Sequence, residues 1–441
     1  YRTNYFKVIS MKHALRQKGF IIVVIALSLI MSCNQTPKEK EQMQQPYPIS
    51  AKEILGNPNY QAISYGGYRK ISRDSQPTIK ELKEDMKLLA AMGIKVLRTY
   101  NVQLPHASNV CKAISELKEE ESSFEMYVML GAWIDCLNAW TDQPVNHNIE
   151  SPDNEAEIKR AVKLAKQYPE IIKVIAVGNE AMVKWATSYY VQPSVILKWV
   201  THLQELKKSG ELPKDLWITS SDDFASWGGG ESSYHTKDLE QLIKAVDYIS
   251  MHTYPYHNTH YNPQFWYVPA NQTELSKKKQ VDLAMKRAID FARKQYDSVY
   301  NYMKSLGVSK PIHIGETGWS SVSNGYYSAT GSRASDEYKQ GLYYKLMREF
   351  TNTNKISCFY FEAFDEQWKD AANPLGSENH FGLFTLDGQA KYPIWHLVDQ
   401  GVFEGLGRNG KPVTKTYDGD LELLMKDVLS PPSQLEVSVA E

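Results

Sequence analysis

The chain has 441 residues, of which 42% are hydrophobic and 23% charged, and this balance is that of an ordinary globular enzyme with one large α/β domain. Residues 1–32 carry five basic side chains and no acidic one, so the remainder has 45 basic against 51 acidic side chains, a formal charge of −6. An acidic domain of this kind argues against nucleic acid as a partner.

The N-terminal segment has the pattern of a secretion signal. Residues 20–31 form an apolar run that follows three basic residues and is too short for a comfortable transmembrane helix. The run ends in Leu-Ile-Met-Ser-Cys, which resembles a bacterial lipoprotein signal, so we expect cleavage before Cys33 and lipid on that residue. Met11 is then the expected start, within a signal segment of residues 1–32. An uncleaved anchor in which Cys33 is incidental is the alternative.

Composition divides the rest of the chain. Residues 33–50 are rich in Lys, Glu, Gln and Pro and are expected to form a flexible tether between the lipid and the folded domain. We predict a catalytic domain over residues 51–404 and a polar tail without an assigned function over 405–441. The expected location is therefore extracytoplasmic, with the chain anchored to a bacterial membrane through its lipid.

Three cysteines remain if Cys33 is lipidated, so at least one of them is free. Cys358 lies in an apolar strand and is expected in the core. A bridge between Cys111 and Cys136 stays open, because sequence alone does not establish a pairing.

Short apolar runs alternate with amphipathic helical patterns along the domain, which predicts a (β/α)₈ barrel. Helices are expected to begin near Pro77, Asp153, Ser194 and Ser335, and residues 281–306 hold one extended helix or two. The eight predicted strands cover residues 60–65, 94–100, 124–130, 172–177, 216–220, 248–252, 312–314 and 356–361.

Two loops that follow strands are unusually long, and both are expected at the carboxyl-terminal face where barrel enzymes build their sites. Residues 254–277 are rich in aromatic side chains, which suit the faces of sugar rings, and residues 362–382 are rich in charge. We expect these two loops to wall an open groove.

Nearly every predicted strand ends in a polar or aromatic residue, as a catalytic rim requires. Two of these ends carry a glutamate, in the sequences Gly-Asn-Glu180 and Ile-Gly-Glu316-Thr-Gly-Trp319. Two carboxylates at strand ends are the minimum equipment for cleaving a glycosidic bond.

These motifs resemble glycoside hydrolase family 17, which contains β-1,3-glucanases and glucanosyltransferases, across roughly residues 63–397. Residues 178–180 resemble the acid/base strand of the wider retaining clan, residues 316–319 the nucleophile motif, and Tyr254-Pro-Tyr the tyrosine that supports the nucleophile. The segments of residues 361–369 and 380–383 resemble the last strand and loop of microbial members. Ser320 departs from the family, which commonly has proline there.

The resemblance and electrostatics together assign expected roles. Glu316 is the nucleophile and must be ionised, with Arg98 and Tyr254 as donors, whereas Glu180 must hold a proton and serve as the acid/base. Asn179 is placed to hydrogen-bond the sugar 2-hydroxyl. The expected substrate contacts are Asn179, Arg98, Tyr100, Tyr254, Trp319, Trp133, Glu362, Trp368 and Lys369, with Trp319 favoured over Trp133 as the sugar platform.

Simpler interpretations stand beside these. Glu180 could be a first-turn helix carboxylate, and Arg98 a structural ion-pair residue. Trp133 and Trp319 could simply be core residues. The charged loop around Glu362 could be a solvated network. His252, His257 and His260 form a rival metal constellation, but they lack regular coordinating spacing, so we expect neither metal nor cofactor.

The sequence thus predicts a retaining glycoside hydrolase that forms a covalent glycosyl enzyme, with its two carboxyl groups about 5 to 5.5 Å apart. The resemblance implies endo-action on β-1,3-glucan of the laminarin type. A β-1,3-glucanosyltransferase is the nearest alternative, and a glycan-binding lipoprotein without catalysis is the alternative from another class.

Overall fold

The computed structural model describes residues 49–440. The expected signal segment, the lipidated Cys33 and most of the tether lie outside the described residues. No helix within residues 49–440 combines the length and apolar character needed to cross a membrane.

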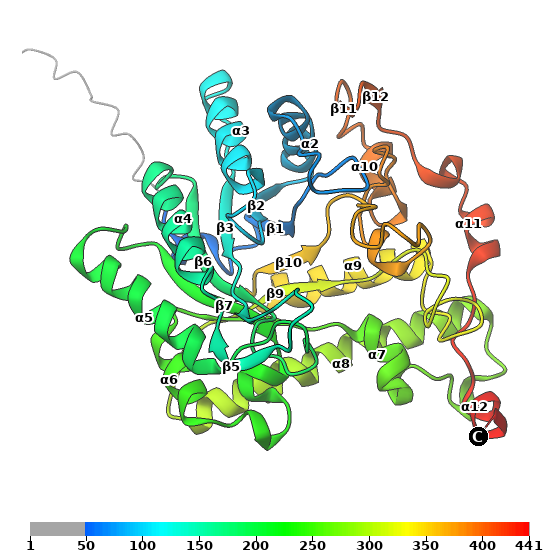
Figure 1. Cartoon of the computed structure of the whole chain (residues 1–441). Helices are drawn as coiled ribbons and strands as arrows, with labels where there is room; N and C mark the ends of the chain where they lie inside the picture. The colour runs from blue at the N-terminus through cyan, green and yellow to red at the C-terminus, as the bar shows by residue number, and fades with distance from the viewer. Residues whose placement is uncertain (1–48, 441) are drawn as a thin grey trace, which may run out of the picture. The chain divides into compact units, whose positions relative to one another are not determined.

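Eight parallel strands close into a barrel in the order β1-β10-β9-β8-β7-β6-β3-β2, and helices surround it (Figure 1). The predicted (β/α)₈ fold is therefore confirmed, and each strand overlaps the apolar run that predicted it. The barrel strands are β1 Gln61–Ser64, β2 Ile94–Arg98, β3 Tyr127–Ala132, β6 Ile172–Asn179, β7 Trp217–Asp223, β8 Ile249–His252, β9 Ile312–Gly318 and β10 Cys358–Phe361.

The strands read as continuous apolar runs because both of their faces are covered. Every residue of β3 and β9 is buried, as expected for parallel strands between a barrel interior and a layer of helices. Inside the barrel, Met129, Val174 and Phe359 pack together with Ile54 of α1 (Ala51–Ile54). A larger apolar cluster fills the space between strands and helices.

The outer helices agree with the expected alternation, although some begin elsewhere than predicted. Thr78 and Glu81 form a capping box on α2 (Ile79–Ala91). The fourth expected helix begins at Pro193 rather than at Ser194, and Asp336 rather than Ser335 caps α9 (Glu337–Thr353). The remaining helices are α3 His106–Glu120, α4 Asn154–Gln167, α5 Pro193–Ser209, α6 Lys237–Ala245, α7 Pro255–Tyr261, the single long α8 Lys277–Ser305, α10 Trp395–Asp399, α11 Leu421–Asp427 and α12 Gln434–Ala440.

The C-terminal segment packs on the barrel. Its hairpin, β11 (Gly407–Arg408) and β12 (Lys411–Pro412), contacts α2, where the fully buried Arg408 meets the fully buried Asp85. Further on, Ser433 forms a parallel bridge with Val268, so the chain returns to the loop after β8 (Figure 1).

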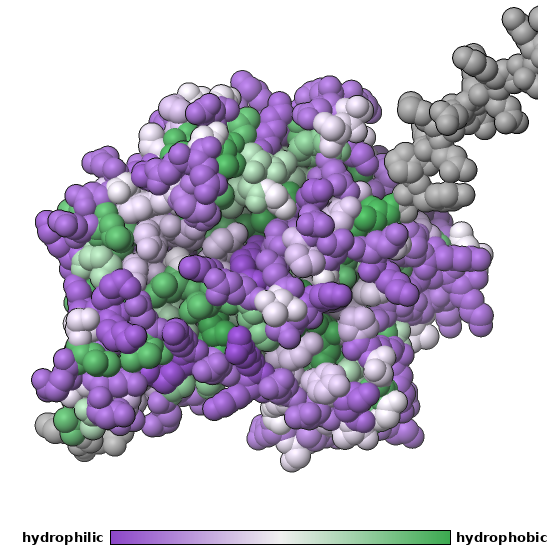
Figure 2. Space-filling view, turned by 180° about the vertical axis from the view of Figure 1, so that it is seen from behind, coloured by the Kyte–Doolittle hydropathy of each residue, from purple (hydrophilic) through white to green (hydrophobic). Residues whose placement is uncertain are grey.

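The aromatic loop after β8 is more ordered and less exposed than its composition predicts. It contains α7, and the rings of Tyr256 and Trp266 are completely buried. Tyr261, in contrast, is 63% exposed. The face shown in Figure 2 is mostly hydrophilic, with hydrophobic residues in small patches.

Cys111, Cys136 and Cys358 are all buried and free. The bridge between Cys111 and Cys136 that the sequence left open is therefore absent. Cys358 lies in the core, as predicted.

Candidate active site

Glu316 lies on β9 among three hydrogen-bond donors from other strand ends. Arg98 Nη1 and the Tyr100 hydroxyl donate to its Oε2, each at 2.7 Å, and the Tyr254 hydroxyl donates to Oε1 at 2.7 Å. Burial by itself would raise the pKa of Glu316, but the positive charge of Arg98 and the hydrogen bonds from the two hydroxyls hold this pKa below its ordinary value. Because Arg98 is a permanent cation, Glu316 is ionised at neutral pH.

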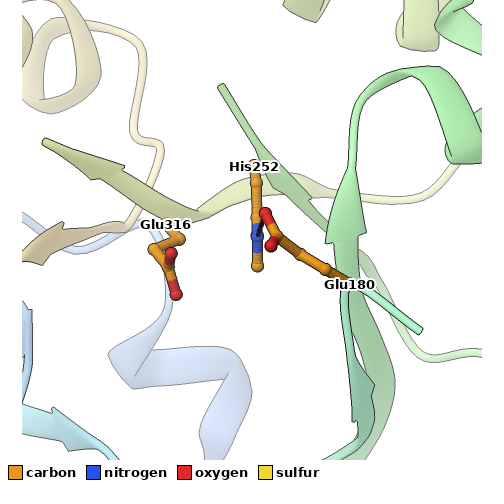
Figure 3. Close-up of side chains that lie close together, drawn as sticks. All are labelled: Glu180, His252 and Glu316. Carbon is orange, nitrogen blue, oxygen red and sulfur yellow. Dashed lines mark hydrogen bonds and ion pairs between the residues drawn. The ribbon is translucent and has the colours of Figure 1, made fainter. Parts of the chain in front are cut away.

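Glu180 follows β6 on a backbone that turns sharply. Gly178 has φ +81°, where a Cβ would lie 2.8 Å from that of Ala181, and Glu180 itself has φ +48°. A non-glycine residue in this left-handed region is uncommon and is held there by surrounding structure. The turn directs the Glu180 side chain toward Glu316 (Figure 3).

The two carboxylates are close neighbours. One oxygen of Glu180 lies within 4.8 Å of one oxygen of Glu316, a spacing typical of retaining rather than inverting glycosidases. Burial, and next the negative charge of Glu316, raise the pKa of Glu180 to about 8. One acid is therefore ionised and the other protonated at neutral pH, as a nucleophile and a general acid require.

Arg98 connects the two strand ends. Its Nη1 binds Glu316, and its Nη2 donates to Asn179 Oδ1 at 2.6 Å. This bond fixes the Asn179 amide with its NH₂ group as the free donor, which suits a sugar hydroxyl. Arg98 does form an ion pair, so the structural interpretation of this residue is correct as well, but the pair lies inside the site.

The interpretation of Glu180 as a first-turn helix carboxylate is wrong. The next helix, α5, begins only at Pro193, and irregular chain separates it from Glu180. A helix dipole therefore does not account for the position of this carboxylate.

Trp319 is not a sugar platform, contrary to our expectation. Its ring is completely buried against Trp266 and Tyr343, and its Nε1 donates to the Ala334 carbonyl at 2.8 Å. The sequence fails here because a tryptophan after a strand end can point to either side of the barrel wall.

Phe361, unlike the buried Trp319, places a partly exposed aromatic ring beside two of the donors to Glu316. It ends β10, is only partly buried, and meets the edges of Tyr100 and Tyr254 at centroid distances of 6.4 and 6.5 Å. Sequence analysis missed it, although its position at the strand end beside Glu362 was a usable signal.

The charged loop after β10 is a buried network rather than a solvated one. Lys369 forms ion pairs with Glu362 and with Glu366, the latter at 3.5 Å, and both glutamates are nearly inaccessible. Glu362 is thus corrected from a substrate contact to a support for Lys369. Trp368 is half-buried, and its Nε1 donates to Glu366 at 2.7 Å.

An aromatic platform lies on the Glu180 side and consists of Trp133, Trp140 and Tyr189. Asp135 Oδ1 accepts the indole N–H of both tryptophans, at 2.6 and 3.2 Å, and Tyr189 stacks on Trp140 at 5.0 Å. Trp140 is 62% exposed, so one face of its ring is free. Of these three residues the sequence predicted only Trp133 as a substrate contact. Trp140 lies between β4 (Cys136–Leu137) and β5 (Asn146–Glu150), and the pairing of these two strands brings it close to Trp133.

The three histidines of the rival metal constellation do not converge. His252 bonds Glu180, His257 bonds the Tyr327 hydroxyl at 3.0 Å, and His260 stacks on Tyr326.

A closed barrel with two neighbouring carboxylates at the carboxyl ends of its strands defines the class of barrel glycoside hydrolases. Residues 62–382 match the model of the BtgE/BtgC glycoside hydrolase domain. The chain belongs to this family, which confirms that it is a glycoside hydrolase and that the resemblance to family 17 was sound.

Individual relatives agree with this assignment. The chain is 66% identical to an endo-laminarinase from Formosa Hel1_33_131, covering 88% of this chain and 98% of that one with a TM-score of 0.87. It is 21% identical to a probable glucan endo-1,3-β-glucosidase of Aspergillus terreus over 75% of this chain but only 45% of that protein's length. A family 17 β-1,3-glucanosyltransferase of Rhizomucor miehei, 20% identical over 76% of this chain and 96% of that one with a TM-score of 0.51, shares the fold.

Proposed function

We propose that this protein is an endo-acting β-1,3-glucanase that hydrolyses laminarin-type glucan with retention of anomeric configuration. The observation that carries the proposal is the pair of carboxylates within 4.8 Å of each other, one surrounded by donors and the other half-buried with its pKa raised to about 8. The linkage and the endo mode are supported by the 66% identity to a protein described as an endo-laminarinase.

The mechanism follows from the two carboxylates. Glu316 attacks the anomeric carbon while Glu180 gives its proton to the leaving oxygen, and the product is a glycosyl ester on Glu316. Glu180, now ionised, takes a proton from water, which attacks the anomeric carbon and releases Glu316. Arg98, Tyr100 and Tyr254 stabilise the Glu316 carboxylate before and after each cycle.

An early-time product profile on soluble β-1,3-, β-1,4- and mixed-linkage glucans tests this proposal. We expect short laminari-oligosaccharides from the β-1,3-glucan, with the anomeric configuration retained by NMR, and little action on cellulose or chitin. Glucose as the only early product would remove the endo mode, and products longer than the substrate would favour a glucanosyltransferase. Glu316→Gln should abolish activity while the fold persists.

We also propose that the mature chain begins at Cys33 and is held on the extracytoplasmic side of a bacterial membrane by lipid on that residue. The support is the basic and apolar segment that ends in Ser-Cys at residues 32–33. Mass spectrometry of protein extracted from membranes tests it, because an unmodified Cys33 inside an uncleaved chain would contradict the proposal.

A further inference from the structure

His252 lies between Glu180, the acid/base candidate, and two serines, Ser221 and Ser250, that are hydrogen-bonded to each other. It ends β8, is completely buried, and places its Nδ1 3.0 Å from Glu180 Oε1 (Figure 3). Its Nε2 lies 2.7 Å from Ser221 Oγ, which in turn lies 2.9 Å from Ser250 Oγ. Both ring nitrogens therefore have one partner each, on opposite sides of the ring.

Glu180 and Glu316 differ in the number of side chains that hydrogen-bond them. Glu316 receives hydrogen bonds from three side chains, whereas His252 is the one hydrogen-bond partner of the Glu180 carboxyl group within residues 49–440. The hydrogen bond from His252 is therefore the one by which the described part of the protein can orient the Glu180 carboxyl group.

The serine pair is built into the barrel. Ser221 and Ser250 are completely buried on β7 and β8, and the neighbouring strand β9 carries Gly315 beside them. A Cβ at Gly315 would lie 2.1 Å from Ser250 Oγ and 2.4 Å from Ser221 Oγ. Because Gly315 has no side chain, the two serine hydroxyls fit beside it, directly before Glu316.

Charges from several strands face this imidazole, yet it is neutral. Burial lowers the pKa of His252 to about 4, although the negative charge of Glu316 acts in the opposite direction. A neutral imidazole carries one N–H, so it donates through one nitrogen and accepts through the other. The charged or titratable groups that act on His252 or Glu180 are Glu316 on β9, Arg98 on β2, Asp222 and Asp223 on β7, and Glu378 in the loop after β10.

We infer that His252 is a positioning residue for the acid/base step, with its proton on Nδ1 and its Nε2 accepting from the Ser221 hydroxyl. The inference rests on the proposed function of Glu180. In this form His252 occupies Oε1 of Glu180, so that the catalytic proton resides on Oε2.

The proton and bonding changes balance without any change on His252. The Oε2 proton passes to the leaving oxygen as the bond from that oxygen to the anomeric carbon breaks and Glu316 forms its own bond to that carbon. Nδ1–H then stabilises the Glu180 carboxylate until a water proton returns to Oε2. The neutral ring stabilises this carboxylate less than a cation would, which keeps Glu180 a weak enough acid to be protonated at neutral pH.

Two matched substitutions separate the two ends of the ring. The short amide of His252→Asn reaches the Nδ1 position and keeps a donor toward Glu180, whereas the longer amide of His252→Gln reaches toward Ser221 and loses that donor. We expect His252→Gln to lower kcat/KM on laminari-oligosaccharides by at least about tenfold, with a much smaller fall on an aryl laminaribioside whose good leaving group needs little acid catalysis. The alkaline limb of its pH profile should move to higher pH, because the Glu180 carboxylate has lost its donor, while His252→Asn should keep the wild-type limb.

An equal loss on both substrates with an unmoved alkaline limb would overturn the inference and leave His252 a structural residue. A second measurement needs neither variant activity nor substrate: NMR of ¹⁵N-labelled histidine in the wild-type chain should show the proton on Nδ1, and a proton on Nε2 while Glu180 is ionised would also overturn it. Because this readout is independent of catalysis, its result is distinguishable from a failure of the proposed glucanase activity.

Discussion

A carboxylate oxygen of Glu180 lies within 4.8 Å of one from Glu316, yet the two acids have opposite pKa shifts. Their surroundings differ: both carboxyl groups are largely shielded from water, but Glu316 has three donors, whereas Glu180 has one contact, with His252, and a negative neighbour. Two glutamates can therefore take the opposite roles that we propose for them, because the barrel gives two strand ends unlike surroundings.

We expect Glu316→Gln to lower the pKa of Glu180 from about 8 toward its ordinary value of 4.5. The substitution removes the negative neighbour, whereas burial, the larger cause, remains, so the pKa should stop above 4.5. Titration of ¹³C-labelled glutamate followed by NMR measures this, with Glu180→Gln to assign the signal. A Glu180 pKa that stays near 8 would show that burial alone sets it.

In the wild-type enzyme, the same pKa should appear as the alkaline limb of activity. Glu180 is useful as an acid only while protonated, so kcat/KM on laminari-oligosaccharides should fall as pH rises through about 8. The acid limb belongs to Glu316 and should lie below pH 4.5, because its pKa is lowered. A rate profile from pH 3 to 10 decides this, and an alkaline limb near 5 would contradict the assignment of Glu180.

The contact between Arg408 and Asp85 should matter for stability rather than catalysis. Arg408 Nε donates to Asp85 Oδ1 at 2.9 Å, and both side chains are completely buried. Removing one partner of a buried ion pair costs about 3 to 5 kcal/mol, and because Arg69 also binds Asp85 we expect Arg408→Ala to cost about 3 kcal/mol of unfolding free energy. Chemical denaturation measures it.

The control for this prediction is Lys411→Ala in the same hairpin, because Lys411 pairs with Asp387 on the exposed surface. We expect this variant to unfold like the wild type. If Arg408→Ala also left the free energy of unfolding unchanged, the buried contact between the C-terminal hairpin and α2 would not stabilise the barrel.

The aromatic platform should bind sugar residues on the leaving-group side. Tyr189 lies in the segment that follows Glu180, and Trp140 stacks on it with one face exposed. We expect Trp140→Ala to lower kcat/KM on long laminari-oligosaccharides by about tenfold, since one aromatic contact contributes about 1 kcal/mol or somewhat more. Activity on an aryl laminaribioside, which has no sugar on that side, should change little.

Trp185 provides the matched control for the platform. It is 61% exposed in the same segment and has no aromatic ring contact within the described part of the chain. Trp185→Ala should leave kinetics on both substrates near the wild type. Equal losses of kcat/KM in Trp140→Ala and Trp185→Ala would mean that the platform binds the substrate no better than any other exposed tryptophan nearby.

The sequence predicted the barrel and the carboxylate pair because both depend on local pattern. Buried parallel strands are continuous apolar runs, and the change to polar residues at their ends marks the rim where Glu180 and Glu316 lie. The partners of these residues were harder to predict. Asp85 meets Arg408 from 323 positions away, and no local pattern records such a contact.

The two aromatic residues near Glu316 show the same limit, and the last prediction concerns them. Trp319 is buried and donates to the Ala334 carbonyl, whereas Phe361 lies beside Tyr100 and Tyr254. We expect Trp319→Phe to lower the unfolding free energy by about 1 to 2 kcal/mol, because a buried acceptor loses its donor. Its kcat/KM should stay near the wild-type value.

Phe361→Leu should show the reverse pattern. The leucine keeps an apolar side chain at the end of β10 but removes the ring that packs against the two tyrosines, which hydrogen-bond Glu316. We expect kcat/KM on laminari-oligosaccharides to fall by about tenfold, the equivalent of about 1.4 kcal/mol, with a smaller change in thermal stability than in Trp319→Phe. Steady-state kinetics and thermal unfolding of both variants test the pair together. A loss of activity confined to Trp319→Phe would restore Trp319 as the sugar platform and contradict a role for the Phe361 ring in supporting the two tyrosines.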